Sequence, residues 1–386
     1  MFYLREEFLF PSELDQTLYS ALKKLGHQKD LGGTLRRLWE KLAKGRGQVR
    51  EGEEHYSFSR DEARAYSSYY LPSNCLKPAL VLEESFLLGT DPMPGQEAHW
   101  LDLGTGPGTA YWGVAWWCRA RGKKLWFTGW DQSPAFTGIA GDLVAAASWS
   151  APAKFLSGKE EPAELIRRLK PTHVSMMNAV AEIYPDCKRR TAEVGKIVRA
   201  LRDLERSDGR PRFLLLIEPG SRESSRELAQ LKDELQAGNL GKVMLPCLDD
   251  RICGALADPK DWCHEEAACK FPAWLNELGA EAGLRKESLL FSYAWIRAGE
   301  PDPAPACLRI VSQRLERKGQ VECRICTKEG KRAVRVQRSK ANEQNEFFFG
   351  LARGDLWKSA EIGEKGDLVR ADPATAQVPH SLFANT

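Results

Sequence analysis

A glycine-rich segment, LDLGTGPGTA at residues 101–110, constrains the fold of this chain more than any other feature. It carries Gly104, Gly106 and Gly108 at every second position, between an apolar run and an apolar, helix-like stretch. Glycines at this spacing let the backbone turn sharply and lie against a ligand, and the helix that follows offers unpaired N–H groups. The spacing is not the G-x-G-x-x-G of dinucleotide-binding proteins, and the Lys-Ser/Thr of a P-loop is absent. The segment therefore predicts a strand, a ligand-binding turn and a helix; the alternative is a turn needed only for folding.

Strand-like and helix-like segments alternate after this turn. In chain order they are a strand at 124–131, a helix at 136–149, a strand at 172–183, a helix at 188–205, a strand at 211–220 and a helix at 224–236. Such alternation predicts an α/β, Rossmann-like fold with a parallel, doubly wound sheet. We expect four parts, which are a helical region at 1–95, the α/β domain at 96–300 with a cysteine-rich insertion at 247–269, a basic β-rich extension at 301–358 and a loose tail at 359–386.

Composition limits the possible compartments and partners. Lys and Arg total 56 against 53 Asp and Glu, a net charge of +3 that is too even to indicate a partner. No apolar run approaches the roughly 20 residues that a membrane helix needs, so we expect no membrane partner. The amino-terminal segment contains Glu6, Glu7, Glu13 and Asp15, which is not typical of a transit peptide and favours a cytoplasmic protein. Ten cysteines in a cytoplasmic chain indicate metal or redox chemistry rather than a disulfide framework.

The cysteine-rich insertion is a candidate metal site. Cys247, Cys253 and Cys263 have the spacing C-x5-C-x9-C, Cys269 follows, and a C-x2-C pair occurs later at Cys323 and Cys326. A zinc ribbon normally has two close pairs, whereas an iron–sulfur cubane needs four thiolates without fixed pairing. The pattern predicts a metal site and leaves zinc and iron–sulfur open. The alternative is buried free thiols, which we expect for Cys75, Cys118, Cys187 and Cys307.

The glycine segment, with Asp102 inside the preceding strand and Asp131 at the end of the next, resembles the S-adenosylmethionine loop of class I methyltransferases. The resemblance implies that Asp102 helps to hold the methionine amino group, that Asp131 binds the ribose hydroxyls and that the glycine backbone lies against the cofactor. A carboxylate suits the ribose because it can accept two hydroxyl hydrogen bonds. Asn178 lies near where substrate-facing groups of this fold occur, or else caps a strand. We nominate no catalytic base, because the sequence has no amine-methylation motif and no Pro-Cys nucleophile in this domain.

Several segments together resemble one family, the methyltransferase-like proteins that assemble the small ribosomal subunit of mitochondria, with their bacterial relatives. They are LDLGTGPGTA, LLLIEPGS, DWCH, VECRICTKEG and ARGDLW. The resemblance implies a [4Fe-4S] cluster held by Cys247, Cys253, Cys263 and Cys326, with Cys323 as the alternative fourth ligand. It also implies docking on small-subunit ribosomal RNA and ribosomal proteins, in the cytoplasm for a bacterial-type protein and in mitochondria for eukaryotic relatives. Methyl transfer stays open.

The β-rich extension carries most of the local positive charge. Residues 308–340 contain eleven Lys or Arg against three Glu, so 11 − 3 = +8. Cationic strands can contact phosphates, although a charge run is more often a solvated surface. The aromatic run 347–349 either stacks on bases or belongs to a core. We expect a monomeric ribosome-assembly or translation factor; the alternatives are an active S-adenosylmethionine-dependent ribosomal RNA methyltransferase and a zinc-stabilised methyltransferase of another substrate.

Overall fold

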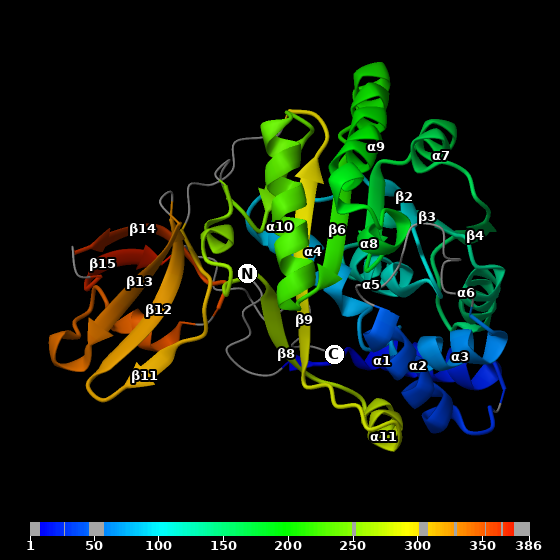
Figure 1. Cartoon of the computed structure of the whole chain (residues 1–386), viewed down its shortest axis with the longest axis horizontal. Helices are drawn as coiled ribbons and strands as arrows, with labels where there is room; N and C mark the ends of the chain where they lie inside the picture. Colours follow the sequence, from blue (N-terminus) through cyan, green and yellow to red (C-terminus); the bar gives the residue numbers. More distant parts are fainter. Residues whose placement is uncertain are drawn as a thin grey trace.

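The computed structural model describes residues 8–26, 28–45, 58–248, 252–300, 308–327, 330–351, 353–363 and 366–373. Two β-sheets and the helices around them make up this part of the chain (Figure 1). The helices are α1 (Ser12–Lys24), α2 (Leu31–Gly45), α3 (Arg60–Tyr69), α4 (Leu76–Leu87), α5 (Thr109–Ala120), α6 (Pro134–Ala146), α7 (Pro162–Leu169), α8 (Val180–Ile183), α9 (Cys187–Asp208), α10 (Arg222–Ala237) and α11 (Ala273–Glu281). None of them is both long enough and apolar enough to cross a membrane.

The strands of the central sheet are β1 (Phe8–Leu9), β2 (Glu97–Leu103), β3 (Lys124–Asp131), β4 (Ala153–Ser157), β5 (His173–Met177), β6 (Phe213–Pro219), β7 (Lys242–Leu245), β8 (Glu265–Lys270) and β9 (Ser288–Arg297). Their order is β1-β8-β9-β6-β5-β2-β3-β4, with β7 also paired to β9. The neighbouring strands β4, β3, β2, β5 and β6 are parallel to one another, whereas β9 runs antiparallel to β6, β7 and β8. This arrangement confirms the predicted α/β, Rossmann-like fold, and the cysteine-rich insertion joins β7 to β8 along one edge of β9.

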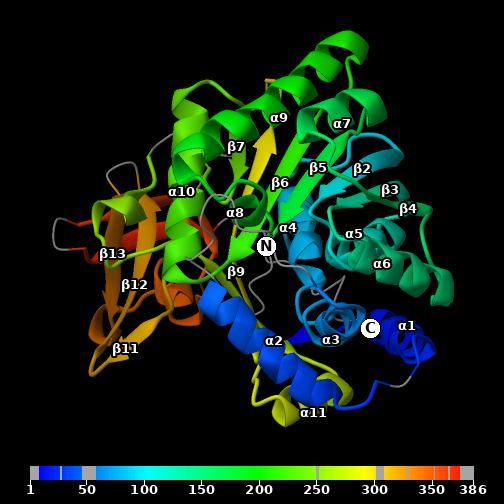
Figure 2. The same ribbon diagram turned by 45° about the vertical axis from the view of Figure 1, so that its right-hand side comes forward.

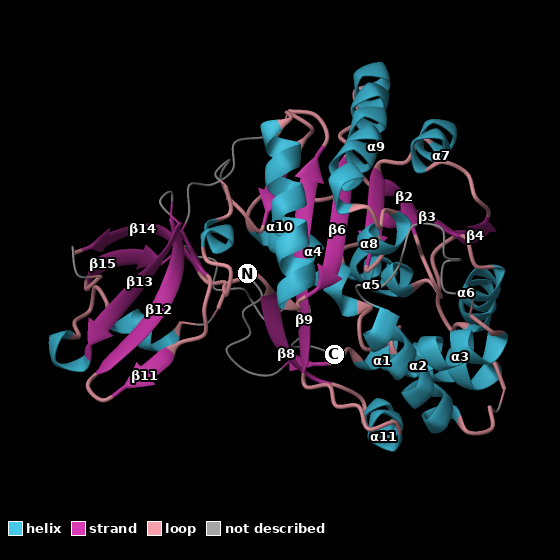
Figure 3. Cartoon of the chain, viewed as in Figure 1, coloured by secondary structure: helices cyan, strands magenta, loops and turns pink. Residues whose placement is uncertain are grey.

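Helices cover both faces of the central sheet, as the layers in Figures 2 and 3 show. Apolar side chains of α5 and α6 pack on one face, and those of α7, α9 and α10 pack on the other. Successive residues of β2 point to opposite faces of the sheet, because Trp100 packs in the core beside α5 and α6 and Leu101 packs in the core beside α7, α9 and α10. Burial on both faces explains why these strands read as near-continuous apolar runs in the sequence.

A stack of rings crosses the sheet from β2 to β9. Trp100, His173, Phe213 and Trp295 lie on four neighbouring strands, with successive ring centroids 5.0, 5.2 and 4.9 Å apart. Stacked aromatic side chains on adjacent strands stabilise a sheet beyond the area that they bury. The stack therefore fixes the register of the strands that carry the candidate sites.

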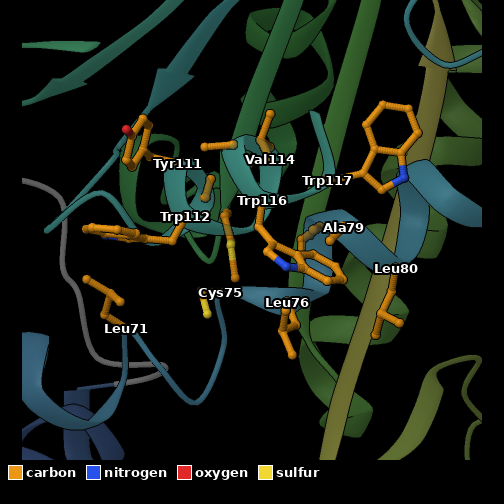
Figure 4. Close-up of a cluster of buried hydrophobic side chains, with 14 of the residues drawn as sticks. Leu71, Cys75, Leu76, Ala79, Leu80, Tyr111, Trp112, Val114, Trp116 and Trp117 are labelled. Atoms are coloured by element: carbon orange, nitrogen blue, oxygen red, sulfur yellow. The ribbon is translucent and has the colours of Figure 1, made fainter. Parts of the chain in front are cut away.

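Helices α4 and α5 pack unusually closely beneath the sheet (Figure 4). A Cβ atom at Gly113 would lie 1.8 Å from the backbone oxygen of Cys75, so only glycine fits there. Apolar side chains surround this contact, including Leu76 and Ala79 of α4 and Trp112 of α5. The predicted helical region before the sheet is therefore part of the same core. Its first strand, β1, was not expected from the sequence and pairs in parallel with β8.

The second sheet contains β10 (Leu308–Ile310), β11 (Leu315–Arg317), β12 (Gln320–Thr327), β13 (Gly330–Gln337), β14 (Leu356–Ile362) and β15 (Leu368–Pro373). It lies beside the β8–β9 edge of the central sheet, and all its strand pairs are antiparallel (Figure 1). Phe348 and Trp357 are buried in its core, which confirms the core interpretation of the aromatic run for Phe348.

The predicted loose tail at 359–386 differs from the structure. Strand β14 runs to Ile362 and β15 follows, and Leu368 is buried in the core of the second sheet. The register of β14 and β15 shifts twice, which breaks the period of two that would reveal such strands in a sequence. Residues 374–386 lie outside the described residues.

Candidate functional site

The glycine turn connects β2 to α5 in the conformation that its sequence predicted. Gly104, Gly106 and Gly108 have φ values of +69°, +53° and +82°, all in the region that favours glycine. The N–H groups of Gly104 and Thr105 donate to the Trp130 oxygen at 2.8 and 3.0 Å. A Cβ at Gly104 would meet that of Ala179 at 2.6 Å, whereas one at Gly106 would meet nothing within 4 Å. The start of the turn is therefore in close contact with the segment between β5 and α8, and the middle of the turn is open.

Asp131, the last residue of β3, holds the turn from the side. Its Oδ2 accepts the Gly106 N–H at 2.8 Å, and its Oδ1 accepts the Ser133 N–H at 2.8 Å. Burial raises the pKa of Asp131, and the backbone donors oppose that rise. The structure thus brings two predicted cofactor residues, Gly106 and Asp131, into direct contact.

Asp102 lies inside the sheet rather than at its surface, with 1% of its area exposed. Its Oδ1 accepts the Ser175 hydroxyl, which in turn accepts the Trp100 indole N–H at 2.8 Å. Burial raises the pKa of Asp102 to about 7, and the Ser175 hydrogen bond opposes this shift. Asp102 therefore links β2 to β5, and no sequence pattern selects its partner, Ser175.

The sheet reverses its order between β2 and β5, the point at which open α/β sheets bind ligands. Asn178 follows β5 at this point with a left-handed φ of +55°. Its side-chain Oδ1 is buried and has no hydrogen-bond partner among the described residues. The neighbouring Val180 N–H donates to Glu218 Oε1 of β6 at 3.0 Å. A buried amide oxygen without a partner at a switch point is a candidate ligand contact.

The thiol set consists of Cys247, Cys253 and Cys263, all from the insertion between β7 and β8. These three thiols lie near enough to affect one another's ionisation. Burial raises the pKa of Cys263 to about 12, and the neighbouring Cys253 and Cys247 add to this effect. The structure therefore brings together the three cysteines that the sequence selected in this segment.

Lys232 of α10 is the cation of the thiol set. Its side chain is 4% exposed, and its Nζ donates to Cys247 Sγ at 3.0 Å. The same ammonium pairs with Asp233 Oδ1 at 3.0 Å, and Asp233 Oδ2 accepts the Cys253 N–H at 2.8 Å. Burial lowers the pKa of Lys232, but the nearby thiolates and Asp233 raise it more. No sequence motif selected Lys232, because one lysine in an amphipathic helix carries no distinguishing signal.

The two cysteines of β12 point to opposite sides of the second sheet. Cys323 is 2% exposed and belongs to the apolar core of that sheet, with Val321 and Ile325. Cys326 has the opposite parity in the strand and is half-buried outside that core. Its register partner on β13 is Lys331, whose Nζ pairs with Asp261 Oδ1 at 2.8 Å, two residues before Cys263.

Arg309 of β10 joins the second sheet to the central domain. It is the register partner of Cys326 on the other side, and its Nε donates to the Pro246 oxygen at 2.9 Å, next to Cys247. Its guanidinium also pairs with Glu84 of α4, and both side chains are almost fully buried. The strand that carries Cys326 is therefore fixed next to the thiol set by buried contacts on both neighbouring strands.

Within the described ranges, no group of three or more His, Cys, Asp or Glu side chains is placed so that it could hold a metal ion, so the predicted metal site stays a prediction. Cys269 lies apart from the thiol set, buried in the central core near Cys75. His264 stacks on Trp262 at 5.5 Å, and burial lowers its pKa to about 4.

Of the four cysteines expected to be buried, Cys75 and Cys118 are buried and Cys187 is exposed at the start of α9. Exposure of Cys187 corrects that expectation, since the first residue of an amphipathic helix needs no buried face. Cys307 lies outside the described residues.

Much of the positive charge of the extension is already paired. Arg309 and Lys331 are buried in the contacts above, Arg335 pairs with Asp367, and Glu316 pairs with two further arginines, Arg314 and Arg338. The basic side chains that stay exposed on β11, β12 and their turn are Arg317, Lys318 and Arg324. A count of +8 therefore overstates the charge that faces solvent.

Solved structures similar to this chain include several methyltransferases. Magnesium protoporphyrin IX methyltransferase from Synechocystis, solved with bound SAM, is 12% identical with a TM-score of 0.33, over 70% of this chain and 99% of that one. A putative class I methyltransferase from Listeria monocytogenes is 13% identical with a TM-score of 0.32, over 75% and 87%. A SAM-dependent methyltransferase from Geobacter sulfurreducens, solved with S-adenosyl-L-homocysteine, is 17% identical with a TM-score of 0.31, over 58% and 92%. No curated protein matched.

A family model described as "mitochondrial small ribosomal subunit Rsm22" matches residues 92–370. The matched range contains the glycine turn, the thiol set and the strand that carries Cys326. It covers well over half of the chain and confirms the resemblance that the sequence motifs indicated. The chain belongs to the Rsm22 family of the mitochondrial small ribosomal subunit.

Proposed function

We propose that this protein is an assembly or translation factor of the small ribosomal subunit that binds S-adenosylmethionine in its α/β domain and a [4Fe-4S] cluster at its thiol set. In this proposal it acts as a monomer on ribosomal RNA and ribosomal proteins. The family match over 92–370 carries the ribosomal part. The proximity of three thiols within the cysteine-rich insertion carries the metal part.

The cofactor part rests on the turn between β2 and α5. The open side of Gly106, the Asp131 carboxylate bound to its N–H, and the unpartnered Asn178 oxygen suit a ligand with hydroxyl and amino groups. In this proposal Asp131 binds the ribose, the glycine backbone lies along the cofactor, and Asp102 fixes β2 against β5. S-adenosylmethionine would supply an activated methyl group.

The cluster part rests on the chemistry of the donors alone, because the described residues contain no group of three or more ligands already placed to hold a metal ion. Cys247, Cys253, Cys263 and Cys326 would be the ligands, because thiolates are the ligands of iron–sulfur clusters. Buried ammonium groups of Lys232 and Lys331 lie beside them and offset negative charge. The outward parity of Cys326 favours it over Cys323 as the fourth ligand. A bound cluster would crosslink the central domain to the extension.

The RNA part rests on the exposed cations of the second sheet. Arg317, Lys318 and Arg324 are exposed there, and Arg324 shares its strand face with Cys326. Phosphate contacts by such cations release counterions, so binding should weaken steeply as salt increases.

The test is anaerobic purification followed by an absorbance spectrum and assays for iron, sulfide and zinc. We expect a brown protein whose cluster is lost in Cys263→Ser and in Cys326→Ser and kept in the matched control Cys323→Ser. We also expect salt-sensitive binding to small-subunit ribosomal RNA. A colourless zinc protein without affinity for that RNA would contradict the proposal and favour a zinc-stabilised methyltransferase of another substrate.

A second candidate function is methyl transfer to ribosomal RNA, which the unpartnered Asn178 oxygen at the switch point favours. It predicts incorporation of labelled methyl groups into ribosomal RNA that disappears in Gly106→Arg, whose side chain would fill the open side of the turn. Calorimetry decides first, because a protein that does not bind S-adenosylmethionine cannot transfer its methyl group.

A further inference from the structure

Arg226 of α10 occupies the centre of the cysteine-rich insertion. Its Nη1 shares two N–H groups among three backbone oxygens, which are Asp258 O and Asp261 O at 2.7 Å and Ala255 O at 3.0 Å. Its Nη2 donates to Leu256 O at 3.3 Å. All four carbonyls lie between Cys253 and Cys263. One guanidinium therefore ties together the whole segment that separates two members of the thiol set.

Arg226 has no carboxylate partner among the described residues, which is unusual for a cation that is partly buried. Carbonyl groups in an irregular segment would otherwise lack partners, which is unfavourable for each one that is buried. The planar fork of arginine carries five N–H donors and can serve several acceptors at once. A lysine ammonium at the same place has three donors and lacks the fork geometry.

Two further residues of α10 hold the flanks of this segment. Asp233 accepts the Cys253 N–H, and Lys232 donates to Cys247 Sγ. Asp233 lies seven residues after Arg226, so the two side chains share one face of the helix. The helix thus contacts the insertion at the two cysteines and at the loop after them.

We infer that Arg226 is a positioning residue that folds the 253–263 segment before any metal binds, so that the thiol set is preorganised on α10. The metal part of this inference rests on the proposed function, whereas the folding part does not. Many small metal sites behave in the opposite way, because the metal itself supplies their folding free energy. The two cases differ in the metal-free protein.

The experiment is hydrogen exchange by mass spectrometry on the full chain, stripped of metal under anaerobic conditions. The amides of Leu256 and Asp261 donate to Cys253 O at 2.9 Å and Asp258 O at 3.0 Å, so a peptide spanning both reports the segment. We expect protection in the unmodified protein and an at least tenfold loss in Arg226→Lys. Arg222→Lys, an exposed arginine at the start of the same helix, is the matched control and should exchange like the unmodified protein.

Peptides from β2 and β9 show in the same run whether the variant is folded. The inference is overturned if the metal-free segment of the unmodified protein already exchanges freely, or if Arg226→Lys keeps its protection. Reconstitution of the metal-free protein with iron and sulfide adds a second measurement, the rate of metal loss, which would not change if Arg226 only stabilised the fold. Iron with sulfide should restore protection to Arg226→Lys, and a chelator should then remove the metal at least tenfold faster than from the control.

The two proposals fail in different ways. An unmodified protein that takes up no iron contradicts the proposed cluster, and the exchange of the metal-free segment still decides the role of Arg226. An unmodified protein that binds the cluster while Arg226→Lys exchanges like Arg222→Lys overturns the role of Arg226 alone.

Discussion

The contact between Arg309 and Glu84 gives a prediction whose magnitude follows from burial. Their side chains are 4% and 6% exposed, and Glu84 also accepts the Tyr293 hydroxyl at 2.5 Å. Arg309→Met keeps most of the apolar stem and removes the charge, which leaves the Glu84 carboxylate buried without its cation. Breaking a buried pair in this way costs about 3–5 kcal/mol of stability.

A matched pair in the same sheet sets the baseline. Arg338 and Glu316 are 53% and 54% exposed, so Arg338→Met should cost only about 0–1 kcal/mol. The double variant Glu84→Gln/Arg309→Met removes both charges of the buried pair. We expect it to be more stable than Arg309→Met by about 0.5–3 kcal/mol, the range of coupling between contacting residues.

Urea unfolding measures these differences, and hydrogen exchange at Ile310 shows where they act. The Ile310 N–H donates to the Asp355 oxygen inside the second sheet, so its exchange reports opening of the extension. Arg309→Met should speed this exchange, whereas amides of β2 and β5 should change less. The reasoning is refuted if Arg309→Met is as stable as Arg338→Met to within about 1 kcal/mol, since the two expected costs require a difference of at least about 2 kcal/mol.

Three further predictions concern the core and the cofactor turn. Gly113→Ala should prevent folding or destabilise the chain by more than about 3 kcal/mol, because its Cβ would overlap the Cys75 backbone. Gly138→Ala, in an open stretch of α6, should instead stabilise the chain by about 0.5–1 kcal/mol. Thermal unfolding distinguishes the two variants. The pKa of Asp102 is about 7 in the folded chain and about 4 when the chain is unfolded. The unmodified protein should therefore lose stability relative to Asp102→Asn as the pH rises from about 4 to about 7. Urea unfolding at several pH values tests this, and the same pH dependence of the unfolding free energy in both proteins would exclude it. Asp131→Ala should weaken S-adenosylmethionine binding at least tenfold by calorimetry, since it removes a charged hydrogen-bond acceptor, and unchanged affinity would exclude Asp131 from the site.

The sequence was sufficient for features that repeat over short distances. Alternating apolar segments predicted the central sheet, and the spacing from Gly104 to Gly108 predicted a sharp turn between a strand and a helix, which has positive φ at all three glycines. The opposite faces of Cys323 and Cys326 were also present in the sequence, because strand alternation groups Cys323 with the apolar Val321. That signal becomes usable only when the strand is known to have one buried face.

Contacts between distant segments could not be predicted in the same way. Arg226 and Lys232 look like ordinary polar positions of an amphipathic helix, and their partners occur about 15 to 35 residues later in an irregular loop. The pairing of β1 with β8 joins two short strands that are more than 250 residues apart in the sequence. The charge count of the extension was misleading for a related reason, since the acids that neutralise Lys331 and Arg335 lie outside the counted segment.

The turn that begins α10 serves both candidate sites. The Gly220 oxygen accepts the Trp262 indole N–H at 3.1 Å, one residue before Cys263. Two residues before Gly220, Glu218 accepts the Val180 N–H beside Asn178 at the switch point. A displacement of the cysteine-rich insertion therefore reaches the end of β6 through one hydrogen bond, and the end of β5 through one more. Because α10 also supplies Arg226, the helix that binds the insertion begins directly after the turn and the strand end that contact both candidate sites.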